Sequence, residues 1–208
     1  MDNLKTRFVV FDLETTNNPE KNYKHEIIEI AGIEIAGNKI NHDNVFHSLV
    51  RPPCRIQPHN YKVSGISDTM VGNAPFIWQV LPKFINFIGS DPLIGHNVSF
   101  DMRVLNEHMT DLEYNKVPNI SLDTLILSKK IYKTEKSHSL DDIIQRLDIE
   151  QSHRERHRAL GDVEYTAVIF MKFLDILRQY HITTLRDIKS FCDGSRDLED
   201  FRQLELFK

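Results

Sequence analysis

Residues 7–12 read RFVVFD, a run of β-branched and aromatic side chains that ends in an acidic residue. Such a continuous apolar run predicts a strand buried on both faces, which belongs in the middle of a sheet. The segment EIIEIAGIEIAGNKI (26–40) is also rich in β-branched residues, and Gly37-Asn38 can turn the chain into a further strand at 45–50. These segments, separated by the polar loop NNPEKNYKHE (17–26), predict a meander of strands.

Helical spacing of apolar residues dominates the rest of the chain. It predicts helices at 59–66, 75–89, 98–109 and 159–180, with a short apolar strand, PLIG, at 92–95. Ser139, followed three residues later by Asp142, resembles the N-cap of another helix. Early strands, later helices and one strand–helix alternation favour an α/β fold with a mixed sheet covered by helices on both faces.

The composition fits one folded domain with a short appendage. The 208 residues are 40% hydrophobic and 27% charged, which excludes collagenous and wholly disordered chains. We expect a domain at 1–180 and a C-terminal extension at 181–208. Within that extension, ITTLRDIKSFCDG (182–194) is consistent with either a packed helix or an ordered linker.

Charge, hydropathy and cysteine usage limit where in the cell the protein can act and which partners it can bind. No apolar run reaches the roughly 18 residues that cross a bilayer, and no secretion signal is visible, so we expect no membrane partner. The two cysteines, Cys54 and Cys192, suggest no disulfide framework, which fits the cytoplasm. The net charge of −4 provides no global basic field, so any nucleic-acid binding must be local or depend on cations gathered by carboxylates.

Asp12 and Glu14 follow the first strand directly. Residues two apart on a strand project from the same face, about 6 to 7 Å apart, so both carboxylates could contact one metal ion or a pair. The Asp-x-Glu string occurs four more times, but only this copy follows a buried apolar strand. By itself the pattern fits ordinary strand-end carboxylates equally well.

Two further groups of polar residues lie later in the chain. In GHNVSFD (95–101), His96 and Asn97 leave a strand and Asp101 falls in the first turn of the next helix, where open α/β sheets bind ligands. The helix dipole alone could also explain Asp101. In HRALGD (157–162), His157 and Asp162 would point about 140° apart on a helix, so His157 must precede it on a loop. A solvated His is the simpler interpretation of that residue alone.

Together, four acidic residues and one loop His are what metal-assisted phosphodiester hydrolysis requires. FDLETT (11–16), GHNVSFD and HRALGD resemble the three motifs of the DEDDh exonucleases, which include the proofreading epsilon subunit of bacterial DNA polymerase III and exodeoxyribonuclease X. The resemblance covers residues 7–175 and implies a ribonuclease H-like fold. It also implies two Mg²⁺ or Mn²⁺ ions, held by the carboxylates of Asp12, Glu14, Asp101 and Asp162, and His157 as the general base.

The resemblance implies a 3′–5′ exonuclease that removes nucleoside 5′-monophosphates from DNA 3′ ends in replication proofreading or repair. It further implies that Thr15, Thr16, His96 and Asn97 hold the terminal nucleotide. Ser64 stands where many relatives have His. An exoribonuclease of the same superfamily and a non-catalytic adaptor with an exonuclease-like fold are the alternatives, and the complete catalytic set argues against the adaptor.

The C-terminal residues QLELF (203–207) resemble the short motif that docks bacterial polymerases and repair proteins on the β sliding clamp. A polar anchor and three apolar side chains suit a groove on a partner. These docking residues are Gln203, Leu204, Leu206 and Phe207. The same residues could instead pack on the protein's own core, and a polymerase partner stays open.

Overall fold

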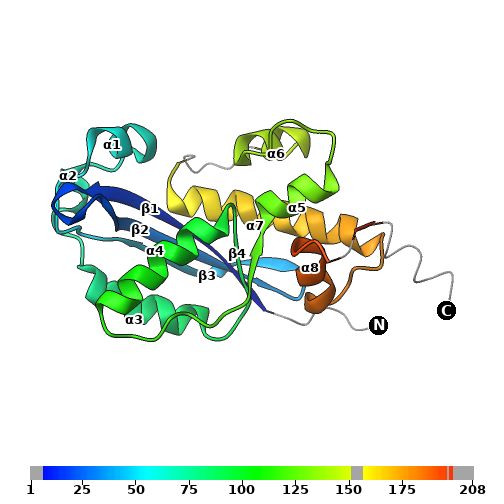
Figure 1. Cartoon of the computed structure of the whole chain (residues 1–208), viewed down its shortest axis with the longest axis horizontal. Coiled ribbons are helices and arrows are strands. Elements are labelled where there is room, and N and C mark those ends of the chain that lie inside the picture. The colour runs from blue at the N-terminus through cyan, green and yellow to red at the C-terminus, as the bar shows by residue number, and fades with distance from the viewer. Residues whose placement is uncertain (1–6, 151–156, 196, 199–208) are drawn as a thin grey trace.

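The computed structural model describes residues 7–150, 157–195, 197 and 198. They form a five-stranded sheet in the order β3-β2-β1-β4-β5 (Figure 1). β1 (Phe8–Asn18) is central, antiparallel to β2 (Lys24–Ala36) and parallel to β4 (Leu93–Gly95). β3 (Lys39–Leu49) and β5 (Ser121–Asp123) form the two edges. The apolar run at 7–12 is therefore central, and the sheet is mixed, as predicted.

Helices cover both faces of the sheet (Figure 1). The principal ones are α3 (Ile77–Ile88), α4 (Val98–Asp111), α5 (Thr124–Ile131), α6 (Leu140–Arg146), α7 (Ala159–Arg178) and α8 (Leu185–Cys192). Val9, Phe11 and Leu13 pack with α3 and α4, whereas Phe8 and Val10 pack with α7. Because side chains alternate along a strand, this central strand is apolar at every position before Asp12.

The strands of the first hairpin are longer than the sequence pattern indicates. β1 continues to Asn18, and the segment expected as a polar loop contains only the one-turn 3₁₀ helix η1 (Pro19–Lys21) before β2 begins. Asn18 Nδ2 donates to Glu26 Oε1 at 3.0 Å, and both side chains are buried. Polar side chains that satisfy one another across the ladder thus allow strand pairing to extend through a polar stretch.

Three short elements carried too little pattern to be predicted: α2 (Asp68–Val71), β5 and α5. The first helix, α1 (Pro58–Ser64), and the N-cap of α6 were predicted. Ser139 Oγ accepts from the Asp142 amide at 3.2 Å, and Asp142 Oδ2 accepts from the Ser139 amide at 3.1 Å. This reciprocal pair is a capping box.

The segment after α7 is a packed helix rather than a linker. In α8, Ile188 and Phe191 are fully buried in the core that α7 shares with the sheet. The division of the chain at residue 180 stays a prediction, and the QLELF segment lies outside the described residues. In the part of the chain that the structure describes, no helix is long and apolar enough to span a membrane.

Candidate functional site

The central strand delivers two carboxylates to one edge of the sheet. Its parallel pairing with β4 ends at Val10↔Ile94, so Asp12 and Glu14 lie just beyond the carboxyl end of β4. By strand alternation they project to the same side as Val10, toward α7. The pairing with β2 shifts register directly after Glu14, and a bulge at this point changes the direction of the strand next to the two carboxylates.

A third carboxylate comes from the first turn of α7. One oxygen each of Asp12, Glu14 and Asp162 lie within 4.8 Å of one another. Oxygens this close can share a divalent cation, and carboxylate oxygens are the ligands that Mg²⁺ and Mn²⁺ prefer. Residues far apart in the sequence therefore meet as a candidate metal site, which contains three of the four carboxylates that the family resemblance implies.

Asp101 approaches this group from the opposite layer of the sheet, although it is not one of the three residues whose oxygens lie within 4.8 Å of one another. It lies in the first turn of α4, is only 5% exposed, and its Oδ1 accepts from the Leu13 amide at 3.2 Å. Leu13 stands between Asp12 and Glu14, so this bond ties α4 directly to the carboxylate end of β1. Burial is the largest cause that raises the pKa of Asp12, and the charge of Asp101 is the second largest.

Burial and mutual repulsion make these carboxylates hard to ionise without a cation. Burial, followed by the charges of Asp162 and Glu29, raises the pKa of Glu14 to about 8. Burial raises the pKa of Asp101 to about 7, and the pKa of Asp12 lies well above its usual range. A bound divalent cation would compensate these like charges. The residues present therefore fit the predicted metal ions.

The raised pKa values predict that Mg²⁺ stabilises the protein and does so more at pH 8 than at pH 6. Above the unfolded-state pKa of about 4.5, the metal-free folded state retains protons that the unfolded chain has lost, so its stability falls as pH rises toward 8. Protons also compete with the cation at pH 6. At pH 8 and about 100 times the dissociation constant, the melting temperature should rise by roughly 5–10 °C.

Thermal unfolding at both pH values, with and without MgCl₂, measures this effect. KCl at matched ionic strength controls for general screening. An equal rise in melting temperature with KCl, or a rise at pH 6 as large as that at pH 8, would contradict the predicted linkage between proton release and cation binding.

Glu29 was not identified from the sequence, yet it holds the start of α7. It lies on β2 opposite Glu14, and its side chain is completely buried. Arg158 donates Nε to Oε2 at 3.1 Å and Nη2 to Oε1 at 2.6 Å, and the Ala159 amide donates to Oε2 at 2.9 Å. His47 Nε2 lies 2.8 Å from Oε1. Since Ala159 begins the helix that carries Asp162, this network sets the position of that carboxylate.

The ionisation of Glu29 contrasts with that of its neighbour across the ladder. Burial alone would raise the pKa of Glu29, but hydrogen bonds from His47, Arg158 and the Ala159 amide lower it to about 2. A charged side chain within the apolar strand EIIEIAG was the one signal in the sequence, because buried charges are rare unless they are paired. Nothing in that local pattern identified the partners.

His157 precedes α7, as predicted. It is exposed, and its backbone adopts a left-handed conformation with φ of 61°. Its amide donates to Asp162 Oδ1 at 3.2 Å. This backbone contact holds the residue beside the carboxylate group while the side chain remains accessible to solvent.

Asp123, also missed from the sequence, organises the adjoining strand end. Its carboxylate accepts from the amides of Asn97 at 2.9 Å, Val98 at 3.1 Å and Leu125 at 2.9 Å, and so serves the beginnings of both α4 and α5. Asn97 is exposed and left-handed, with φ of 62°. His96 Nδ1 lies 3.0 Å from the Thr124 hydroxyl. In the sequence, an Asp directly before Thr124 and Leu125 indicates only an N-cap of α5, and gives no sign of the contact with the start of α4.

The two threonines after Glu14 face different neighbours. The Thr16 hydroxyl is buried and accepts from the Gln57 amide at 2.9 Å, which fixes the start of α1. Thr15 Oγ1 lies 3.4 Å from His25 Nδ1. Thr16 therefore holds the start of α1 in this structure, and a direct substrate contact by either residue stays a prediction.

A mixed sheet between helices, with four carboxylates at the carboxyl end of its parallel strands, is the arrangement of a ribonuclease H-like nuclease. Comparison with protein families matches residues 9–170 to RNase_T, described as an exonuclease family. The match covers most of the chain, which therefore belongs to this exonuclease family.

Two bacterial relatives agree with this assignment. The chain is 35% identical to DNA polymerase III subunit epsilon of Aquifex aeolicus, over 82% of this chain and 81% of that protein. It is 37% identical to DNA polymerase III PolC-type of Caldanaerobacter subterraneus, over 90% of this chain but only 13% of that protein. The chain thus corresponds to a small part of the PolC-type relatives and to most of an epsilon subunit.

Solved structures share the fold. The nuclease domain of 3′hExo, a DEDDh family member bound to rAMP, superposes with a TM-score of 0.70 at 19% identity, covering 85% of this chain and 95% of that one. Exonuclease X in complex with 5′ overhanging duplex DNA gives a TM-score of 0.65 at 24% identity, covering 81% and 92%. The predicted ribonuclease H-like, DEDDh-type fold is confirmed.

Proposed function

We propose that this protein is a metal-dependent 3′–5′ exodeoxyribonuclease that removes nucleoside 5′-monophosphates in replication proofreading or repair. The observation that carries the proposal is the convergence of Asp12, Glu14 and Asp162 oxygens within 4.8 Å, with Asp101 beside them. Four carboxylates from three separated elements repel one another when they are brought together without a cation to bind. Membership of the exonuclease family explains why the carboxylates are gathered, since a nuclease would use them to bind metal ions.

The carboxylates of Asp12, Glu14, Asp101 and Asp162 would hold two Mg²⁺ or Mn²⁺ ions. When bound, such ions stabilise negative charge on the scissile phosphate and lower the pKa of water. His157, exposed beside Asp162, would accept the proton of the attacking water. The new bond joins the water oxygen to phosphorus, and the bond from phosphorus to the 3′ oxygen of the preceding nucleotide breaks. Thr15, Thr16, His96 and Asn97 are proposed to hold the departing nucleotide.

Relatives that are named for a DNA polymerase favour DNA over RNA as the substrate. One relative is named as the epsilon subunit of DNA polymerase III and the others as DNA polymerase III of the PolC type, and from this likeness we infer a polymerase partner. The main alternative is an exoribonuclease, which the 3′hExo domain bound to rAMP keeps open as a fold that accepts a ribonucleotide. We also propose that QLELF (203–207) docks on a β sliding clamp, which would raise the local concentration of the enzyme at a primer end.

Product analysis on DNA and RNA strands of one sequence, labelled at the 5′ end, tests the proposed reaction. With Mg²⁺ or Mn²⁺, the DNA should shorten stepwise from its 3′ end and release nucleoside 5′-monophosphates; with EDTA it should stay intact. Faster shortening of RNA would instead assign the protein to RNA processing. No shortening of either strand would overturn the enzymatic proposal in favour of an adaptor.

A further inference from the structure

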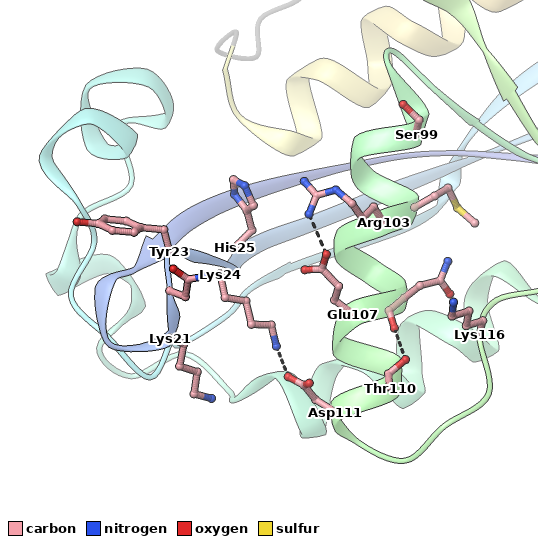
Figure 2. A pocket seen from close by; sticks show the side chains of 13 residues that line it. Lys21, Tyr23, Lys24, His25, Ser99, Arg103, Glu107, Thr110, Asp111 and Lys116 are labelled. Carbon is pink, nitrogen blue, oxygen red and sulfur yellow. Dashed lines mark hydrogen bonds and ion pairs between the residues drawn. The ribbon is translucent and has the colours of Figure 1, made fainter.

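We propose that a basic groove beside the carboxylate site binds the phosphate backbone of the single strand that leads to the 3′ end. This inference rests on the proposed nuclease function. The groove has a volume of about 990 Å³ and lies between the tip of the β1–β2 hairpin and one side of α4 (Figure 2). The hairpin side chains of Lys24 and His25 face α4 across it in Figure 2.

The charge of the groove is opposite to that of the whole chain. Four basic and two acidic side chains line it: Lys21, Lys24, Arg103, Lys116, Glu107 and Asp111. Its formal charge is therefore +2, whereas the chain carries −4. A local positive surface on an acidic protein can concentrate a polyanion there.

Two of these cations are available to a ligand. Lys24 forms an ion pair with Asp111, and Arg103 pairs with Glu107 at 2.8 Å, which leaves their acidic partners neutralised. Among the described residues, the side chains of Lys21 and Lys116 have no hydrogen bond or ion pair, although the charge of Lys21 acts on Asp111. An ammonium group that is in no ion pair loses no direct contact when it binds a phosphate.

None of the four carboxylates lines the groove, but residues next to two of them in the sequence connect it to the carboxylate site. His25 lies 3.4 Å from the hydroxyl of Thr15, the residue after Glu14, and packs edge-to-face on Phe100 with ring centroids 5.0 Å apart. Phe100 directly precedes Asp101, and Ser99 on the same turn lines the groove. A nucleic-acid strand whose last phosphate lies at the carboxylates would therefore extend away from them along this groove.

The length of the groove suits several nucleotides. From Ser99 to Asp111, α4 rises by about 18 Å. Successive nucleotides of one strand are about 3.4 Å apart along a duplex and farther apart when extended, so roughly three to five fit beside the helix. A nucleic-acid strand carries negative charges at regular intervals along this whole length, whereas a single small anion would occupy only one point of it.

Replacing the two lysines that are in no ion pair tests the inference. Lys21→Ala/Lys116→Ala should bind a 5′-labelled oligothymidylate of about 15 nucleotides roughly tenfold more weakly, measured by fluorescence anisotropy with Ca²⁺ in place of Mg²⁺. The slope of log affinity against log salt should decrease in magnitude by about 1.4, because each phosphate contact on a single strand contributes about 0.7. Thermal melting checks that the variant is folded.

A matched control removes the same charge elsewhere. Lys129 on α5 and Lys172 on α7 are exposed and lie on the opposite layer of the sheet. Lys129→Ala/Lys172→Ala should bind as the wild type does. Equal affinity and salt slope for the groove variant and the wild type would overturn the proposal, as would equal weakening in both double variants, which would reveal a response to net charge only.

The nuclease function is tested separately with a p-nitrophenyl ester of thymidine 5′-monophosphate, which is too small to extend along the groove. If the wild type hydrolyses neither this ester nor oligonucleotides, the proposed function fails. The anisotropy comparison still decides the groove, since it requires binding and no turnover.

Discussion

Replacing Asp12 by Asn should lower the rate of DNA hydrolysis by about 10³-fold or more and, without metal, should raise the melting temperature. Asn has nearly the shape of Asp, but it offers one neutral oxygen in place of a carboxylate. Stabilisation by bound cations contributes several kcal/mol to such a transition state, and about 1.4 kcal/mol corresponds to tenfold in rate. The stability should rise because burial and the charges of Asp101 and Glu14 oppose the ionisation of Asp12.

The opposite directions of these two effects make the prediction specific. Turnover is measured on a labelled single strand, and melting temperatures are measured in EDTA and in MgCl₂. The rise in melting temperature that Mg²⁺ gives the wild type should largely disappear in Asp12→Asn. Asp43→Asn, an exposed Asp on β3, should change neither quantity. Loss of activity together with lower metal-free stability would indicate damage to the fold instead of loss of a ligand.

Replacing Glu29 by Ala should lower both the stability and the turnover. The substitution removes the acceptor for the Ala159 amide and for two donors of Arg158. Loss of a helix cap costs about 1 kcal/mol and loss of hydrogen bonds to a charged group about 1.5–3 kcal/mol, so we expect the free energy of unfolding to fall by roughly 2–4 kcal/mol. Turnover should fall because the first turn of α7, which carries Asp162, is no longer fixed.

Glu34→Ala provides a matched control on the same strand. Glu34 is also nearly buried and accepts from Arg7, Asn41 and Asn44, but it pairs with Val9, at the opposite end of β1 from the carboxylates. Urea unfolding should show a loss of stability in both variants, whereas turnover at 25 °C should fall in Glu29→Ala alone. Equal turnover in the two variants would remove the positioning role from Glu29.

The pH dependence of stability should also depend on Glu29. Because its folded pKa of about 2 lies below the unfolded value of about 4.5, Glu29 contributes stability that is present above pH 4.5 and is lost as the pH falls through about 2. This direction is opposite to that for Glu14, which stands across the ladder. The pKa values of these two neighbouring glutamates are thus shifted in opposite directions. Glu29 accepts hydrogen bonds from Arg158 and the Ala159 amide, whereas burial and the charges of nearby carboxylates outweigh the charge of Arg158 at Glu14.

Local patterns in the sequence were sufficient for the central strand, for α7 and for the capping box of α6. A buried strand shows as an uninterrupted apolar run, a long helix as an apolar period of 3.6 residues, and a cap as two polar residues three positions apart. Each of these signals depends on residues that are close along the chain. The same reasoning placed His157 ahead of its helix, because two helical positions five apart cannot face one point.

The sequence by itself determined which residue types stand at the ends of strands and helices, and the resemblance of its three motifs to a known family implied which carboxylates act together. Only the tertiary structure decided that Asp162 meets Asp12, that Glu29 and Asp123 hold the starts of three helices, and that strand pairing continues through the polar residues to Asn18. The physical reason is that a buried polar group must find its partners wherever the fold brings them, and those partners lie many residues away, beyond the range of any local period.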